Sequence, residues 1–126
     1  MIEAASLLYQ LTKDKRYLAD AREIAKSSAE YFFNHDTKQD FNLLKNGNIW
    51  FHAIMLRGFI TLYEQDKEGQ YVKLFNKNLN YAWQYMRDDH DFFYTDWTLK
   101  EKKATKNLID QCAFAEMYAR LMKFDK

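Results

Sequence analysis

Apolar residues along the chain recur at the three- and four-residue spacing of amphipathic helices, and they predict five helices. The second helix, which we expect to begin after Asp14, carries an apolar stripe from Tyr17 to Phe32 with charged residues on its opposite side. The fourth repeats this stripe from Tyr71 to Met86. Both patterns are typical of helices that bury one side and expose the other to water.

The other three predicted helices are more apolar. The third, Ile49 to Tyr63, is apolar nearly all round, and the fifth, Leu108 to Met122, is similar. Such a helix has to be covered on nearly every side. Buried and half-exposed helices therefore alternate, which predicts an inner and an outer ring. In the first helix, Ile2 to Leu11, the residues expected to face inward are Ala4, Ala5, Leu7, Leu8 and Leu11.

The predicted connections also alternate in length. Two are short, Lys13 to Lys15 and Gln65 to Glu68, and two are long, Asn34 to Asn48 and Asp89 to Lys106. In antiparallel hairpins the short turns lie at one end and the long loops at the other. Because binding residues concentrate on long ordered loops, we expect the functional end at the N-terminal ends of the third and fifth helices.

A repeat supports the same architecture. A spacing of 54 residues does not fit tetratricopeptide repeats of about 34 residues or HEAT and armadillo repeats of about 40 to 47. It suits the hairpins of an α/α toroid, with one long loop per unit. We therefore predict an all-α fold with residues 1–126 in a single domain. The tyrosines that recur at this spacing are Tyr9, Tyr17 and Tyr31, followed by Tyr63, Tyr71 and Tyr85.

Composition narrows the classes of function. The chain has 19 Lys and Arg against 18 Asp and Glu, so we expect neither nucleic acid nor an anionic membrane as a partner. It has no apolar run of about 18 residues and no signal peptide pattern, so a complete chain of this sequence would be cytoplasmic. The histidines have no metal-ligand spacing and no glycine motif cradles phosphate, so no metal or cofactor is expected. Cys112 is predicted to be a buried free thiol.

Three stretches of the chain resemble glycoside hydrolase family 76, the α-1,6-mannanase-like proteins. They are Ile2 to Ala21, the Phe-x-x-Ile-x-x-Arg helix from Phe51 to Arg57, and Ala82 to Trp97 with its Asp-Trp pair. The resemblance implies part of an (α/α)6 barrel of six hairpins, of which this chain would be the C-terminal portion. It also implies hydrolysis of α-mannosidic linkages by a pair of adjacent aspartates.

In the family, that aspartate pair lies upstream of the region matched here. No catalytic residue is therefore assigned within this chain, and the chain alone is expected to be inactive. Asp88 and Asp89 are adjacent, but they fall at the end of an outer helix, where the family pattern places no catalytic acid. We interpret them as a solvated turn.

Sugar binding has more support from the residues themselves. Pyranose rings present apolar C–H faces to aromatic side chains, and their hydroxyls need polar partners. Both kinds of side chain gather at the expected long-loop end. The predicted substrate-binding residues are Trp50, Phe51, His52, Tyr94, Asp96 and Trp97.

An incomplete barrel would leave the flanks of the first, third and fifth helices uncovered, so we expect pairing with the rest of the barrel or self-association. Two alternatives stay open from the sequence. One is another six-hairpin sugar enzyme, such as an epimerase-like or unsaturated-glucuronyl hydrolase-like barrel. The other is a helical-hairpin interaction module without enzymatic activity.

Overall fold

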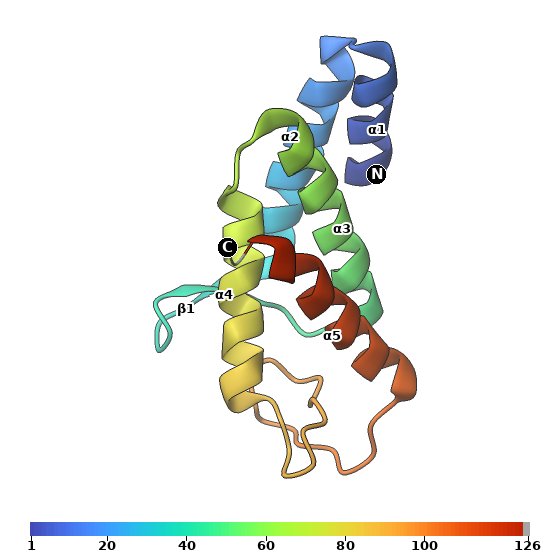
Figure 1. Cartoon of the computed structure of the whole chain (residues 1–126). Coiled ribbons are helices and arrows are strands. Elements are labelled where there is room, and N and C mark those ends of the chain that lie inside the picture. The colour runs from blue at the N-terminus through green and yellow to red at the C-terminus, as the bar shows by residue number, and fades with distance from the viewer. Residues whose placement is uncertain (125–126) are drawn as a thin grey trace.

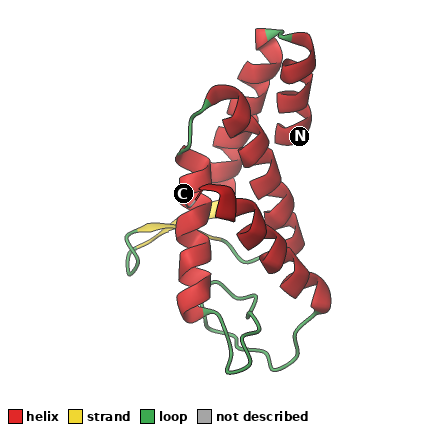
Figure 2. Ribbon diagram, viewed as in Figure 1, coloured by secondary structure: helices red, strands yellow, loops and turns green. Residues whose placement is uncertain are grey.

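The computed structural model describes residues 1–124, which form five α-helices and a small two-stranded sheet (Figure 1, Figure 2). A short 3-10 helix, η1 (Met122–Phe124), follows the last α-helix. No helix in this part of the chain is long and apolar enough to cross a membrane. The α-helices are α1 (Ile2–Thr12), α2 (Lys15–Phe32), α3 (Ile49–Asp66), α4 (Gln70–Tyr85) and α5 (Leu108–Leu121).

The helices fall into the two expected layers. Helix α3 packs between α1 and α5, while α2 and α4 lie outside them (Figure 1). Buried side chains recur along α3 from Ile49 to Leu62, including Ala53, Leu56 and Phe59. Helices α1 and α3 approach closely where residue 58 is glycine, because a Cβ atom there would lie 3.0 Å from the Cβ of Ile2. The predicted alternation of inner and outer helices is confirmed.

The 54-residue repeat is visible in the geometry of the two short turns. Lys13 ends α1 and Lys67 ends α3, both in the left-handed backbone conformation, with φ of 59° and 61°. The backbone N–H of Lys13 donates to the carbonyl oxygen of Tyr9, and that of Lys67 to the carbonyl oxygen of Tyr63. In each pair the lysine ammonium lies 5.8 Å from the centroid of the tyrosine ring. The ends of α1 and α3 therefore have the same geometry 54 residues apart.

Both long connectors join the helix ends opposite these turns, as expected, although the β-hairpin of the first connector projects sideways past α4 (Figure 1). A loop was predicted for Asn34 to Asn48, but the first connector, residues 33–48, contains an antiparallel hairpin of β1 (Phe33–Asp36) and β2 (Phe41–Leu44). The Asp36 carboxylate accepts the N–H groups of Lys38 and Gln39 and so shapes the hairpin turn. Burial of Phe33 and Leu44 holds its base.

The second connector, residues 86–107, has no helix or strand. It is longer than the predicted loop of residues 89–106 because α4 ends at Tyr85 and α5 begins at Leu108. A single bridge pairs Arg87 with Phe93. Backbone hydrogen bonds close two turns, from Asp91 N–H to the Asp88 carbonyl and from Leu99 N–H to the Asp96 carbonyl, and side chains set the rest of its course.

Two predictions of burial are wrong. Of the five residues expected to face inward from α1, only Ala5 is buried, and Leu11 is 81% exposed. Helix α1 packs on α2 and α3 through its other side, with Ile2 and Ser6. Cys112 is also exposed, because α5 packs on its neighbours through another side that includes Phe114. The remaining residues exposed against expectation are Ala4, Leu7 and Leu8.

Candidate functional site

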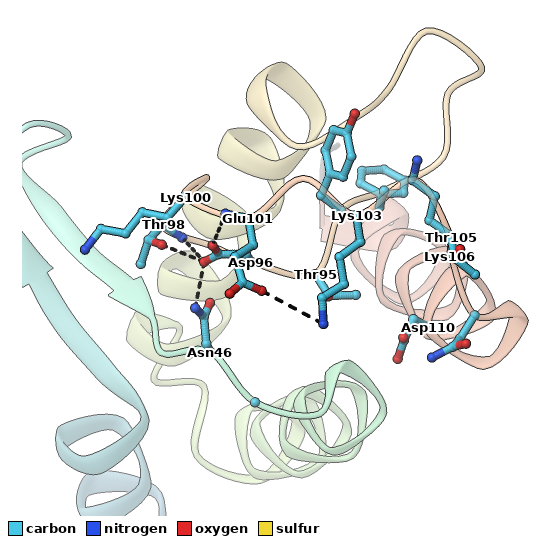
Figure 3. Close-up of a pocket in the computed structure, with 14 residues that line it drawn as sticks. Asn46, Thr95, Asp96, Thr98, Lys100, Glu101, Lys103, Thr105, Lys106 and Asp110 are labelled. Carbon is cyan, nitrogen blue, oxygen red and sulfur yellow. Dashed lines mark hydrogen bonds and ion pairs between the residues drawn. The ribbon is translucent and has the colours of Figure 1, made fainter.

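Two hollows lie at the end of the molecule that carries the long connectors. The polar hollow, about 510 Å³, is formed by the second connector, the start of α5 and the segment after β2 (Figure 3). The apolar hollow, about 470 Å³, lies between the start of α1, the end of α2 and the first turns of α3. Asn46 and Gly47 line both hollows, so the two adjoin.

The predicted site residues divide between these hollows. Phe51 and His52 line the apolar hollow, and Tyr94 and Asp96 line the polar one. Trp50 lines neither, although it is exposed and its ring centroid lies 5.5 Å from that of Phe51.

Trp97 lies beneath the hollows and presents no surface to a ligand, since its exposure is 0%. Its indole packs against the rings of Phe114 and His52, with centroids 6.0 and 6.1 Å away. The Tyr81 hydroxyl donates to the Trp97 carbonyl oxygen at 3.0 Å. These contacts make Trp97 an anchor of the second connector.

Asp96 organises the polar hollow (Figure 3). One carboxylate oxygen accepts the Asn46 amide at 2.6 Å and both the N–H and the hydroxyl of Thr98 at 2.9 and 2.6 Å. The other accepts the N–H of Glu101 at 2.7 Å. Burial opposes ionisation, but these donors outweigh it and lower the pKa of Asp96 to about 2. A carboxylate with four donors is ionised at neutral pH and is not a general acid.

Asn46 connects the two long connectors. While its Nδ2 donates to Asp96, its Oδ1 accepts the backbone N–H of Trp97 at 2.8 Å. The segment after β2 is thereby fixed to the second connector at the boundary between the hollows. The side chain of Asn46 thus sets how the polar and apolar hollows lie relative to each other.

His52 is a buried, neutral histidine at the wall of the apolar hollow. It is 4% exposed, and desolvation lowers its pKa to about 4. Its Nδ1 atom is buried without a hydrogen-bond partner among residues 1–124. Its Nε2 atom lies beside Gly47, where a Cβ would be 3.6 Å away.

The adjacent acids differ from the predicted solvated turn. Asp89 is exposed, but the Asp88 carboxylate contacts the Lys106 ammonium at 2.5 Å and accepts the N–H groups of His90 and Phe92. The Lys106 contact is the main cause that lowers the pKa of Asp88 to about 2. Asp88 therefore joins the two ends of the second connector.

Tyr94 stands at the rim of the polar hollow. The Lys106 ammonium lies 4.5 Å from its ring centroid, and that of Lys102 lies 5.9 Å away. The ring is thus held by cations along the connector, and it remains partly exposed. Within residues 1–124 no group of three or more His, Cys, Asp or Glu side chains could hold a metal ion.

Sequence reasoning missed the amides that hold the connectors. Gln111 on α5 exchanges two hydrogen bonds with the backbone of Phe93, at 2.8 and 2.9 Å. Asn78 on α4 accepts the N–H of Leu44 and donates to the carbonyl of Asn42. The only sequence signal was a polar residue on an otherwise apolar helix side, which a solvent-facing residue shares.

Comparison with known proteins shows which protein family has this sequence and fold. The sequence model of glycosyl hydrolase family 76 matches residues 1–126. A crystal structure of a family 76 glycoside hydrolase from a bovine Bacteroides thetaiotaomicron strain superposes with a TM-score of 0.91 at 27% identity, over 99% of this chain and 28% of that one. A family 76 glycoside hydrolase (mannosidase) from Bacteroides thetaiotaomicron VPI-5482 gives 0.87 at 30% identity, over 99% and 36%. A search of the curated proteins found no match.

The chain thus spans about a third of the length of these solved structures. Its hairpins form part of an α/α barrel of the kind expected from the sequence.

Proposed function

Because this chain belongs to glycoside hydrolase family 76, we propose that it forms one wall of a glycan-binding cleft in an enzyme that hydrolyses α-mannosidic linkages. The family match over the whole chain carries this proposal. It is supported by the two adjoining hollows, one apolar with aromatic side chains and one polar, at the expected functional end. Sugar sites combine apolar faces with a few placed polar groups in this way.

The predicted binding residues take two kinds of role. Phe51, which is 60% exposed, offers a ring for the apolar face of a pyranose, with Trp50 behind it. Tyr94 likewise offers an aromatic ring for a pyranose face, at the rim of the polar hollow. His52 offers a polar atom in the apolar hollow. Asp96 acts on the sugar indirectly, because its oxygens already accept four hydrogen bonds. Trp97, likewise, supports the site from beneath.

Hydrolysis of a glycosidic bond needs two carboxyl groups on either side of that bond, roughly 5 to 10 Å apart. We assign neither to this chain. Asp96 and Asp88 are the two carboxylates with strongly lowered pKa values near the polar hollow, and both are committed to the connector. A polypeptide of residues 1–126 is therefore expected to bind glycan without cleaving it.

The rest of the barrel is the proposed partner of the exposed helix flanks. On α1, Leu7, Leu8 and Leu11 are exposed, and on α5 so are Leu108 and Ile109. These flanks belong to inner helices, and the matched enzymes are about three times longer than this chain. Size-exclusion chromatography with light scattering of residues 1–126 tests the assignment. We expect weak association that adding the remaining hairpins abolishes; a stable dimer that persists with them would contradict it.

Glycan binding can be tested with residues 1–126. Titration with an α-1,6-linked mannotetraose, followed by amide NMR shifts, is expected to affect residues at both hollows, whereas cellotetraose should not. Phe51→Ala should weaken binding by up to about tenfold, the value of one aromatic contact. Phe92→Ala is the matched control, since Phe92 is also exposed but lines neither hollow. An unchanged affinity for Phe51→Ala, or no shifts with mannotetraose, would overturn the proposal.

A further inference from the structure

Two buried polar atoms belong to aromatic rings that pack against each other beneath the apolar hollow. They are Nδ1 of His52 and Nε1 of Trp97, and neither has a hydrogen-bond partner among the described residues. The two rings meet edge to face, with centroids 6.1 Å apart. A buried polar atom left without a partner costs about 1 to 3 kcal/mol, so two on neighbouring rings call for a common explanation.

The two atoms are complementary. The indole Nε1–H can only donate, whereas Nδ1 of a neutral imidazole can accept. A water molecule hydrogen-bonded to both nitrogens requires them to lie about 5 Å apart, and rings whose centroids are 6.1 Å apart allow that separation. Such a water accepts from Trp97 and donates to His52, and both costs are removed at once.

The pairing has a consequence for the other nitrogen of His52. If Nδ1 accepts, the ring proton of the neutral imidazole is on Nε2. If the proton were on Nδ1 instead, two donors would point at one water, whose own hydrogens would need two further acceptors. The low pKa of His52, caused by burial, keeps the ring neutral at pH 7.

Gly47 decides whether that Nε2–H can be reached. It lines the apolar hollow together with His52, and a Cβ at position 47 would lie 3.6 Å from Nε2, in ordinary van der Waals contact. Glycine leaves this atom uncovered. In a hollow otherwise lined mainly by apolar side chains, one fixed donor gives orientation to a ligand.

We propose that Trp97, through one shared buried water, holds His52 in the Nε2–H tautomer, and that this N–H donates to a sugar hydroxyl in the apolar hollow beside Gly47. The second half of this inference rests on the proposed glycan binding; the first half does not. Trp97 is then a positioning residue, and His52 is the group that contacts the ligand.

The tautomer can be measured without any ligand. Long-range ¹H–¹⁵N correlation spectra of residues 1–126 at pH 7 are expected to show His52 with an unprotonated Nδ1 and a protonated Nε2. The indole N–H proton of Trp97 should show an NOE to a long-lived bound water, with NOE and ROE spectra compared to separate this contact from chemical exchange. A proton on Nδ1, or no water contact at this indole, would overturn the pairing.

Trp97→Phe removes the donor while keeping an aromatic ring, and should change His52 to a mixture of tautomers. Trp50→Phe is the matched control, because Trp50 is exposed and its ring packs on Phe51, and it should leave the tautomer unchanged. An unchanged tautomer in a folded Trp97→Phe would contradict the role of Trp97. If that variant does not fold, the wild-type spectra still decide the pairing.

The ligand contact is tested by covering Nε2. Gly47→Ala is free of clash and should weaken mannotetraose binding by about tenfold, the value of one lost hydrogen bond, with the tautomer unchanged. Gly69→Ala, at the opposite end beside Tyr63, is the matched control and should bind like wild type. Equal affinity of the two variants would overturn the contact. If wild type binds no mannotetraose, the proposed function fails, while the tautomer result stands by itself.

Discussion

The two long connectors stand at the same end of the molecule but are held in different ways. The first, residues 33–48, forms a hairpin whose strands pair through their own backbones. The second, residues 86–107, has one isolated bridge and two turns closed by backbone hydrogen bonds, and side chains hold the rest of it. Three side chains hold its backbone, each through two hydrogen bonds to backbone groups of the segment. They are Asp88, Asp96 and Gln111.

This difference matters for both hollows. The second connector lines the polar hollow, and the apolar hollow is lined by Asn46, through which the first connector contacts the second. Asn46 joins them at the boundary. A backbone ladder shares strand pairing among several hydrogen bonds, so we expect the pairing itself to persist when one supporting side chain is removed. A segment held by a few side chains should instead lose its shape when one of them is removed.

Replacing Trp97 by alanine is the strongest test of this difference. It removes a fully buried side chain of the second connector, which costs about 3 to 5 kcal/mol in comparable cores. Urea unfolding monitored by circular dichroism measures the free energy of unfolding. Trp50→Ala, which truncates an exposed indole, should cost less than about 1 kcal/mol. Equal losses for the two variants would show that Trp97 does not anchor the connector.

Asn78→Ala tests whether the hairpin also depends on one side chain. The substitution leaves the buried N–H of Leu44 without its acceptor and frees two carbonyls, for a cost of about 2 to 3 kcal/mol. Hydrogen exchange of the Leu44 amide should accelerate, while strand pairing at Asp36 and Phe41 persists. Asn80→Ala, at an exposed position of the same helix, serves as control. Loss of the whole hairpin would remove the contrast between the connectors.

The helices were predictable from sequence because each carries its own periodic pattern. Asp14 could be identified as the cap of α2 for the same reason, and its side chain does accept the N–H of Arg16. The hairpin was missed because each strand has only four residues and its acceptor, Asn78, lies 34 positions beyond Leu44.

The candidate site was predictable in place but not in detail. Phe51 and His52 follow the start of α3, so their position at the long-connector end could be deduced. Asp96 and Trp97 were predicted to bind sugar directly. The sequence could not show that Trp97 is buried, because an exposed and a buried aromatic residue in a loop have the same sequence pattern. Asp96 and Trp97 are both held by Asn46, which forms hydrogen bonds with them across about 50 positions of sequence. No local pattern records that contact.

Asp96→Asn should cost about 2 kcal/mol at pH 7, since an amide nitrogen would replace an oxygen that accepts a backbone N–H. The folded pKa of Asp96, about 2, lies below the ordinary aspartate value of 3.8, so the unfolded chain binds the proton more readily. The contribution of Asp96 to stability is therefore present above pH 3.8 and is lost as the pH falls toward 2. Urea unfolding at pH 7 and pH 3 should show a smaller decrease for the variant than for wild type. Asp89→Asn, at an exposed position, should keep the wild-type decrease.

Gln111→Ala is the mildest of these changes and the most local. The Gln111 amide forms both hydrogen bonds with the backbone of Phe93, and a net loss of about 1 kcal/mol is expected, because the freed groups can gain water at the edge of the connector. The Phe93 amide should exchange faster with solvent, whereas the Leu44 amide in the hairpin should not change. Gln84→Ala, exposed on α4, is the matched control. If exchange accelerated equally in both connectors, they would be one cooperative unit, and the distinction between a segment held by its backbone and one held by side chains would not stand.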